Sequence, residues 1–116
     1  MKKEILDLIT DCKDVLDELL ETEVKKRVEI AKLINRCNGK LNFLSNLIRG
    51  GCNTENKVER LLTNCNDFSK ICRILFETLY NRNEPREVRE PMYDLDNYRI
   101  YICRGINELC SLKDGK

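Results

Sequence analysis

Apolar side chains recur three and four residues apart along most of the chain, which is the spacing of one face of an α-helix. The clearest stretch lies between Val58 and Leu79, where apolar residues and cysteines alternate at these two intervals as in a heptad repeat. The predicted helices span residues 3–21, residues 24–49, a third segment that contains this repeat, and a fourth that begins near Glu87 or Pro91 and continues through Cys110.

The number of helices depends on residues 21–24, which contain neither glycine nor proline. If the helix continued through them, residues 3–49 would form one helix roughly 70 Å long at 1.5 Å per residue, and only a dimer would cover it. A bend near Thr22 instead gives four helices of comparable length. We therefore predict an all-α, up-down-up-down four-helix bundle, with residues 1–116 as a single domain. Three helices with a long first helix, as a dimer, are the alternative.

Matching positions of the cysteines support the bend. Cys65 and Cys110 share a midpoint between residues 87 and 88, and so do Cys72 and Cys103. This midpoint lies in the loop-like stretch 81–91, so an antiparallel helix pair that turns there would place each couple side by side. By the same reasoning, one layer of the bundle would contain Cys12, Cys37, Cys65 and Cys110.

Three interpretations of these cysteines are open. They are small core residues with free thiols, or they form the disulfides Cys65–Cys110 and Cys72–Cys103, or their sulfurs bind a soft metal ion. Closely spaced cysteine pairs and histidine, which zinc sites use, do not occur in the sequence. No secretory signal is visible, so we favour core thiols in a reducing, cytoplasmic setting and expect no metal and no cofactor.

Composition and net charge argue against some classes of partner. Hydrophobic residues make up 41% of the 116 positions and charged residues 35%, which suits a folded domain. The net charge is only +1, so we expect no nucleic acid as partner. We also expect no membrane partner, because no apolar run approaches the length of a spanning helix. Charge is nevertheless uneven, since residues 1–23 carry eight acids against three lysines.

The residues that most enzymes depend on are scarce. The chain has no histidine, which is the commonest general acid–base, and its serines lie outside any nucleophile-elbow motif. A cysteine nucleophile would also lack its usual histidine partner. We therefore expect a protein that is not an enzyme.

All four tyrosines lie between residues 80 and 101, together with several arginines. Tyrosine and arginine are enriched at the energetic centres of protein interfaces. The predicted partner-binding residues are Tyr80, Arg86, Arg89, Tyr93, Tyr98, Arg99 and Tyr101. The acidic face of residues 3–21 is a second candidate surface.

The sequence thus predicts a protein–protein interaction module that acts as an adaptor or modulator of another protein, and a homodimer is compatible with it. Two alternatives remain. One is a secreted, disulfide-clamped helical protein of the effector or cytokine type. The other is a bundle that perturbs membranes through its apolar residues 41–48.

Overall fold

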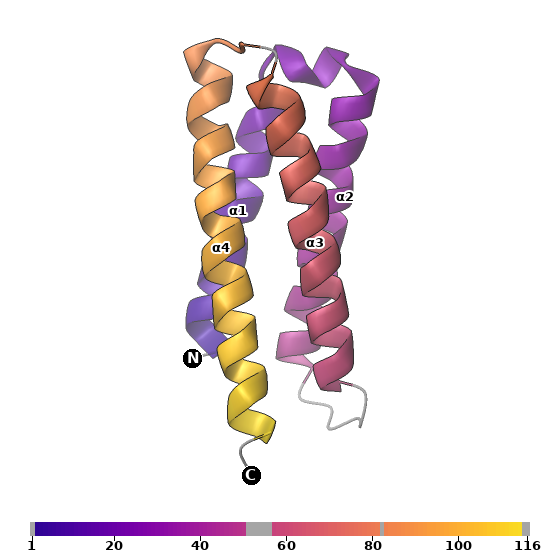
Figure 1. Cartoon of the computed structure of the whole chain (residues 1–116), viewed down its shortest axis with the longest axis vertical. Coiled ribbons are helices and arrows are strands. Elements are labelled where there is room, and N and C mark those ends of the chain that lie inside the picture. Colours follow the sequence, from indigo (N-terminus) through magenta and orange to yellow (C-terminus); the bar gives the residue numbers. More distant parts are fainter. Residues whose placement is uncertain (1, 51–56, 82, 115–116) are drawn as a thin grey trace.

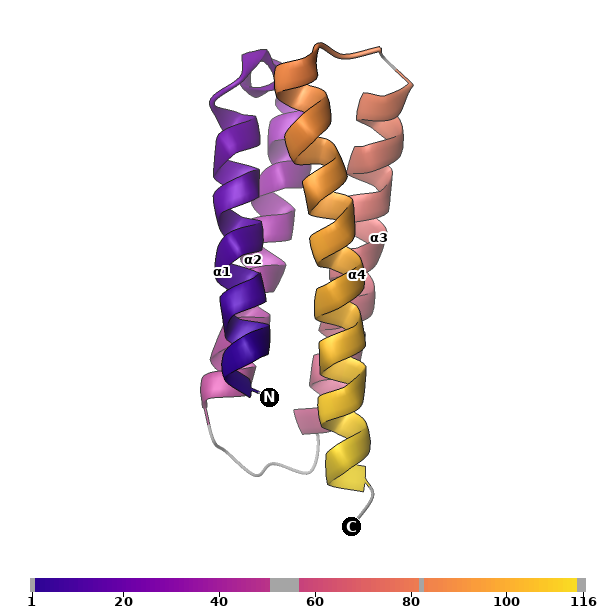
Figure 2. The same ribbon diagram turned by 90° about the vertical axis from the view of Figure 1, so that its left-hand side faces the viewer.

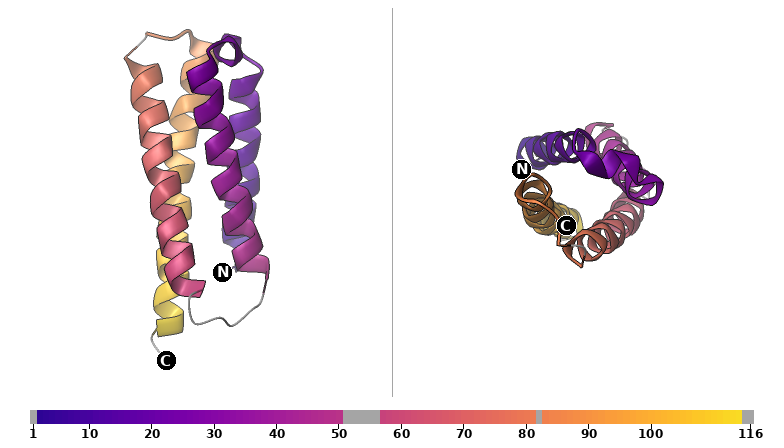
Figure 3. Two further views of the ribbon diagram at one scale, coloured as in Figure 1. Left: turned by 90° about the vertical axis from the view of Figure 1, so that its right-hand side faces the viewer. Right: turned by 90° about the horizontal axis from the view of Figure 1, so that it is seen from above.

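The computed structural model describes residues 2–50, 57–81 and 83–114, which form one antiparallel bundle of long helices (Figure 1 and Figure 2). Its elements are α1 (Lys2–Leu20), the short 3₁₀ helix η1 (Glu23–Lys26), α2 (Val28–Arg49), α3 (Lys57–Tyr80) and α4 (Arg86–Asp114). Viewed along its long axis, the bundle has α1 and α3 at opposite corners, each packed between α2 and α4 (Figure 3). The up-down-up-down prediction is confirmed.

The core is built from one apolar stripe per helix. In α1 the buried stripe contains Ile5, Ile9, Cys12, Leu16 and Leu19, which repeat at intervals of three and four residues. The other three helices repeat this spacing, and their charged residues lie mainly outside the stripe, with buried Lys57 and inward Arg99 as exceptions. Burying one large aliphatic side chain stabilises the fold by roughly 1.5–3 kcal/mol, so the matched stripes hold the bundle together.

The bend between α1 and α2 is made by Thr22 without glycine or proline. The backbone of Thr22 is extended, and its hydroxyl accepts a hydrogen bond from the Val24 amide and donates one to the Leu19 carbonyl. The hydroxyl thus satisfies backbone groups at the end of one helix and the start of the next. Val24 is fully buried beneath the turn. The predicted bend is confirmed, although α2 begins at Val28 rather than near residue 24.

The start of α4 agrees with the first of its two predicted positions, near Glu87, and not with Pro91. The helix begins at Arg86, and the Pro85 carbonyl accepts hydrogen bonds from the amides of Val88 and Arg89. Pro91 therefore lies inside the helix, in its second turn, and not in the first turn where proline is tolerated most easily. The turn between α3 and α4 is correspondingly shorter than the sequence predicts.

This shorter turn changes which cysteines meet. The Cys65 Sγ contacts the Cys103 Sγ at 3.0 Å, and the Cys37 Sγ lies 3.7 Å from that of Cys72. The predicted neighbours Cys65–Cys110 and Cys72–Cys103 are thus wrong. The α3–α4 hairpin turns about Glu84 and not between residues 87 and 88, so each residue of α3 lies opposite a residue of α4 that is seven positions earlier than predicted. The predicted layer of four cysteines is also wrong, because Cys37 of α2 meets Cys72 of α3 and not Cys65.

Two glycines test how closely the helices pack. Gly39 in α2 is exposed, and an added Cβ would have no neighbour within 4 Å, whereas one at Gly105 in α4 would lie 3.0 Å from the Cγ1 of buried Ile5.

Inside a helix, alanine is more stable than glycine by about 1 kcal/mol. We expect Gly39→Ala to stabilise the protein by that amount and Gly105→Ala to lose the gain through the contact with Ile5. Urea unfolding followed by circular dichroism measures both, and equal stabilisation would contradict the tight α1–α4 packing.

Candidate functional site

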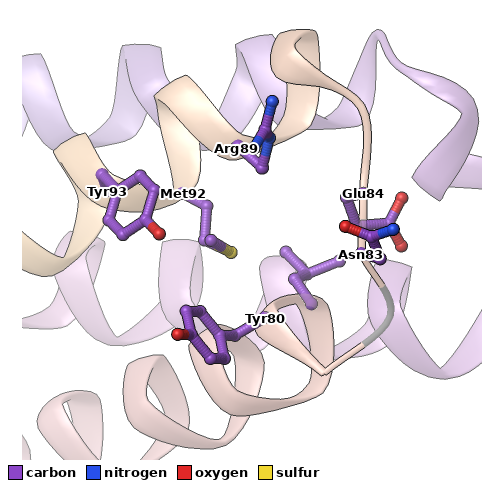
Figure 4. Close-up of a pocket in the computed structure, with 7 residues that line it drawn as sticks. Tyr80, Asn83, Glu84, Arg89, Met92 and Tyr93 are labelled. Carbon is purple, nitrogen blue, oxygen red and sulfur yellow. The ribbon is translucent and has the colours of Figure 1, made fainter.

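A pocket of about 320 Å³ opens between α3 and α4 at the end of the bundle where these helices are joined. Its lining residues are Leu79, Tyr80, Asn83, Glu84, Arg89, Met92 and Tyr93. Figure 4 shows Tyr80, Met92 and Tyr93 toward one end of the pocket and Asn83 and Glu84 toward the other. Leu79 and Met92 are buried core residues, so the pocket reaches the apolar interior.

The tyrosines of the pocket are held by Phe76. Its ring stacks on Tyr80 with centroids 5.8 Å apart and meets the edge of Tyr93 at 5.6 Å. Such geometries are favourable for aromatic pairs and fix the orientation of the rings. Tyr80 nevertheless remains 60% exposed and Tyr93 47% exposed. The rings therefore form a preorganised apolar surface that faces solvent.

The opposite wall of the pocket is fixed by a buried carboxylate. The side chain of Glu84 is only 4% exposed and forms a two-point ion pair with Arg27, which follows η1 at the other turn of this end. Asn83 adopts a left-handed backbone (φ 54°), which asparagine tolerates better than most residues. Glu84 is thus bound within the protein, while Arg89 at the rim is exposed.

The predicted binding residues do not form one surface. Tyr80, Arg89 and Tyr93 line the pocket, while exposed Arg86 binds the Glu90 carboxylate on the outer face of α4. Tyr101 is exposed two turns beyond Tyr93.

The other two lie elsewhere. Tyr98 is half-buried, and burial together with the nearby carboxylates of Asp11 and Asp94 raises its pKa, which places it toward α1. Arg99 lies against α3, where its Nη1 donates a hydrogen bond to the Ser69 hydroxyl.

A signal for the inward position of Arg99 is present in the sequence. The buried stripe of α4 runs through Val88, Met92, Leu95, Ile102 and Ile106, and continuing its alternation of three and four residues places Arg99 in the same stripe. Sequence reasoning also missed Phe76, although its position one turn before Tyr80 is typical of an aromatic pair on one helix face.

A second hollow, of about 380 Å³, lies between α2 and α3. Its lining includes the exposed apolar residues Val28 and Ile74, which are 65% and 51% exposed. It lacks aromatic side chains. We therefore take the pocket between α3 and α4, which contains three of the predicted residues, as the candidate site.

No protein-family model matches this sequence, and searches of curated proteins and of solved structures found no significant match. Among the described residues, no helix is both long enough and apolar enough to cross a membrane. The geometry of the pocket is therefore the basis for a proposed function.

The ion pair behind the pocket gives a stability prediction. Replacing Arg27 with methionine leaves the buried Glu84 carboxylate without its charged partner, and we expect a loss of roughly 2 kcal/mol in the free energy of unfolding. The control is Lys26→Met, because Lys26 pairs with Glu23 on the surface, where both side chains are largely exposed, and such pairs contribute little. Urea titration compares the two variants; equal losses would show that the Arg27–Glu84 pair does not stabilise this end.

Proposed function

We propose that this protein is a non-enzymatic interaction module that binds another protein through the pocket between α3 and α4, as an adaptor or modulator of that partner. The observation that supports this is the pair of solvent-exposed tyrosines, Tyr80 and Tyr93, above a hollow that reaches the buried side chains of Leu79 and Met92. The pocket is concave and its wall combines apolar side chains with polar ones, as binding sites commonly do.

The energetic argument rests on rigidity. A partner that covers Tyr80 and Tyr93 removes two large apolar surfaces from water, and Phe76 already holds the rings in place. Little conformational entropy is then lost on binding, so more of the burial energy contributes to affinity. Truncating such an aromatic anchor typically costs about 2 kcal/mol or more of binding free energy.

The lining also indicates what the partner presents. Methionine adapts to varied apolar shapes, so the floor formed by Met92 accepts an aliphatic or aromatic side chain. Exposed Arg89 at the rim favours an acidic residue beside that anchor, because guanidinium groups pair well with carboxylates. The proposed ligand is therefore a partner segment with one bulky apolar residue next to an acidic one.

We place this activity in the cytoplasm. All six cysteines that the structure describes are free thiols, which is the state that a reducing compartment maintains. Cys52, the seventh, lies outside the described residues.

Affinity capture with point variants tests the proposal. Tyr93→Ala removes one wall of the pocket, and we expect it to reduce recovery of the partner by roughly 30-fold, the equivalent of about 2 kcal/mol. Tyr101→Ala is the matched control, because Tyr101 is on the same helix and 49% exposed but does not line the pocket. Quantitative mass spectrometry of material captured from the source cells compares both with the parent protein.

A photo-crosslinking residue separates direct contact from indirect loss. Placed at position 93, it should attach to the same partner that Tyr93→Ala fails to capture, while at position 101 it should not. Circular dichroism confirms that each variant keeps its helical content. If Tyr93→Ala recovers the same proteins in the same amounts as Tyr101→Ala, the pocket is not the binding site.

A further inference from the structure

The middle of the bundle contains sulfur atoms that the pocket does not involve. The Cys65 thiol donates a hydrogen bond to the Cys103 Sγ at 3.0 Å, and the Cys103 thiol donates a longer one, at 3.9 Å, to the Cys65 carbonyl oxygen. The second couple, Cys37 and Cys72, brings its sulfurs to 3.7 Å. Each couple joins two different helices, so a covalent bond within it would link segments that are distant in sequence.

The two couples differ in their access to solvent. Cys37 and Cys72 are 0% and 1% exposed, and Cys65 is 2% exposed. Of the six cysteines that the structure describes, Cys103 alone is not fully buried. Among these six residues, Cys103 is therefore the one most exposed to solvent. The described residues contain no group of three or more potential ligands arranged for a metal ion, so we consider these sulfurs as thiols.

The surroundings of Cys103 favour its ionised form. Its pKa lies below that of an ordinary thiol, chiefly because Cys65 donates a hydrogen bond to it, and the Arg99 guanidinium and the Ser69 hydroxyl act in the same direction against the effect of burial. Arg99 is held there by a 3.0 Å contact with Asp96 and a 3.1 Å hydrogen bond to Ser69. Cys12, which reaches this cluster from α1, has its own pKa raised mainly by burial.

The other couple has the opposite environment. Burial is the largest cause that raises the pKa of the Cys72 thiol, and its hydrogen bond with Cys37 raises it further. Thiolates attack disulfides and thiols do not, so Cys72 should be inert where Cys103 is reactive.

From this arrangement we propose that Cys103 and Cys65 form a redox-active dithiol that reduces low-molecular-weight disulfides, with Cys103 as the attacking thiolate and Cys65 as the resolving thiol. The inference is independent of the proposed binding function, because neither residue lines the pocket.

The reaction has two steps, and both balance. The Cys103 thiolate attacks one sulfur of the small disulfide, the sulfur–sulfur bond of the reagent breaks, and the leaving thiolate takes up a proton. Cys65 then loses its proton and attacks the Cys103 sulfur, which expels the second thiolate of the reagent. Two electrons and two protons pass to the reagent, which leaves as two thiols, and the protein keeps a Cys65–Cys103 disulfide.

The first test maps thiol reactivity in the folded protein. A Cys52→Ser background removes the cysteine outside the described residues, and a limiting amount of iodoacetamide at pH 7 labels the remaining six. Trypsin separates the relevant sites, since Cys65 falls in residues 61–70 and Cys103 in residues 100–104. We expect Cys103 to be labelled at least tenfold faster than Cys72.

The role of Arg99 is tested by its charge. Arg99→Gln should slow alkylation of Cys103 and move its half-maximal pH upward, because the thiolate loses a neighbouring cation, and Arg99→Lys should restore part of the rate. Arg86→Gln makes the same change on the outer face of the same helix, away from the thiols, and should leave the rate unchanged.

The second test uses bis(2-hydroxyethyl) disulfide, which is small and uncharged. The protein should lose the mass of two hydrogen atoms and yield a crosslink between residues 61–70 and 100–104. Cys65→Ser should instead retain the reagent as a stable mixed disulfide on Cys103, whereas Cys110→Ser should form the crosslink normally. Circular dichroism of each variant confirms that it is folded.

Either of two results would overturn the proposal. One is that Cys103 is labelled no faster than buried Cys72 in the Cys52→Ser protein. This measurement leaves Cys65, Cys103 and their neighbours unchanged. The other is a crosslink that joins a different pair of cysteines.

Discussion

Burial of four matched apolar stripes is the constraint on which the rest of this structure depends. Each stripe occupies one face of one helix. The apolar side chains of any two helices therefore stay partly exposed until the other two helices pack against them. Three reversals of the chain are required, and one of them is made by the hydroxyl of Thr22. Because the two helical hairpins share a single core, the pocket between α3 and α4 rests on a floor whose position is set by the whole bundle.

The helices and the bend could be predicted because their causes are local. Spacing of three and four residues identifies a helix, and the comparable lengths of its parts favour folding back near Thr22. The pairing of the cysteines could not be obtained in this way, because it depends on how many residues the α3–α4 turn uses. Pro91 suggested a long turn, but the helix accommodates this proline in its interior, and the neighbours of Cys65 change accordingly.

The candidate site was predictable only in part. Composition identifies the tyrosine-rich region. The direction of each side chain, however, depends on its angular position around α4, and closeness in sequence does not give that position. Tyr93 and Tyr98 are five residues apart and therefore point to different neighbours, one toward Phe76 of α3 and the other toward the carboxylates of α1. The wall that contains Glu84 could not be foreseen, because its partner Arg27 is 57 positions away in sequence.

Arg99 has a consequence for how uniquely the helices align. Its side chain occupies an otherwise apolar stripe but is only 18% exposed. Asp96 of the same helix pairs with its charge, while the hydrogen bond to Ser69 of α3 forms in the observed alignment of the two helices. If α4 slipped by one heptad, Met92 or Ile106 would arrive opposite Ser69, and the Arg99 guanidinium would keep Asp96 but lose its hydrogen bond to the Ser69 hydroxyl. Leaving a largely buried donor without this hydrogen bond costs about 1–3 kcal/mol. Arg99 therefore contributes less packing energy than an apolar residue would at this position. In return, it disfavours misaligned packings of α4 that the repetitive stripe would otherwise permit.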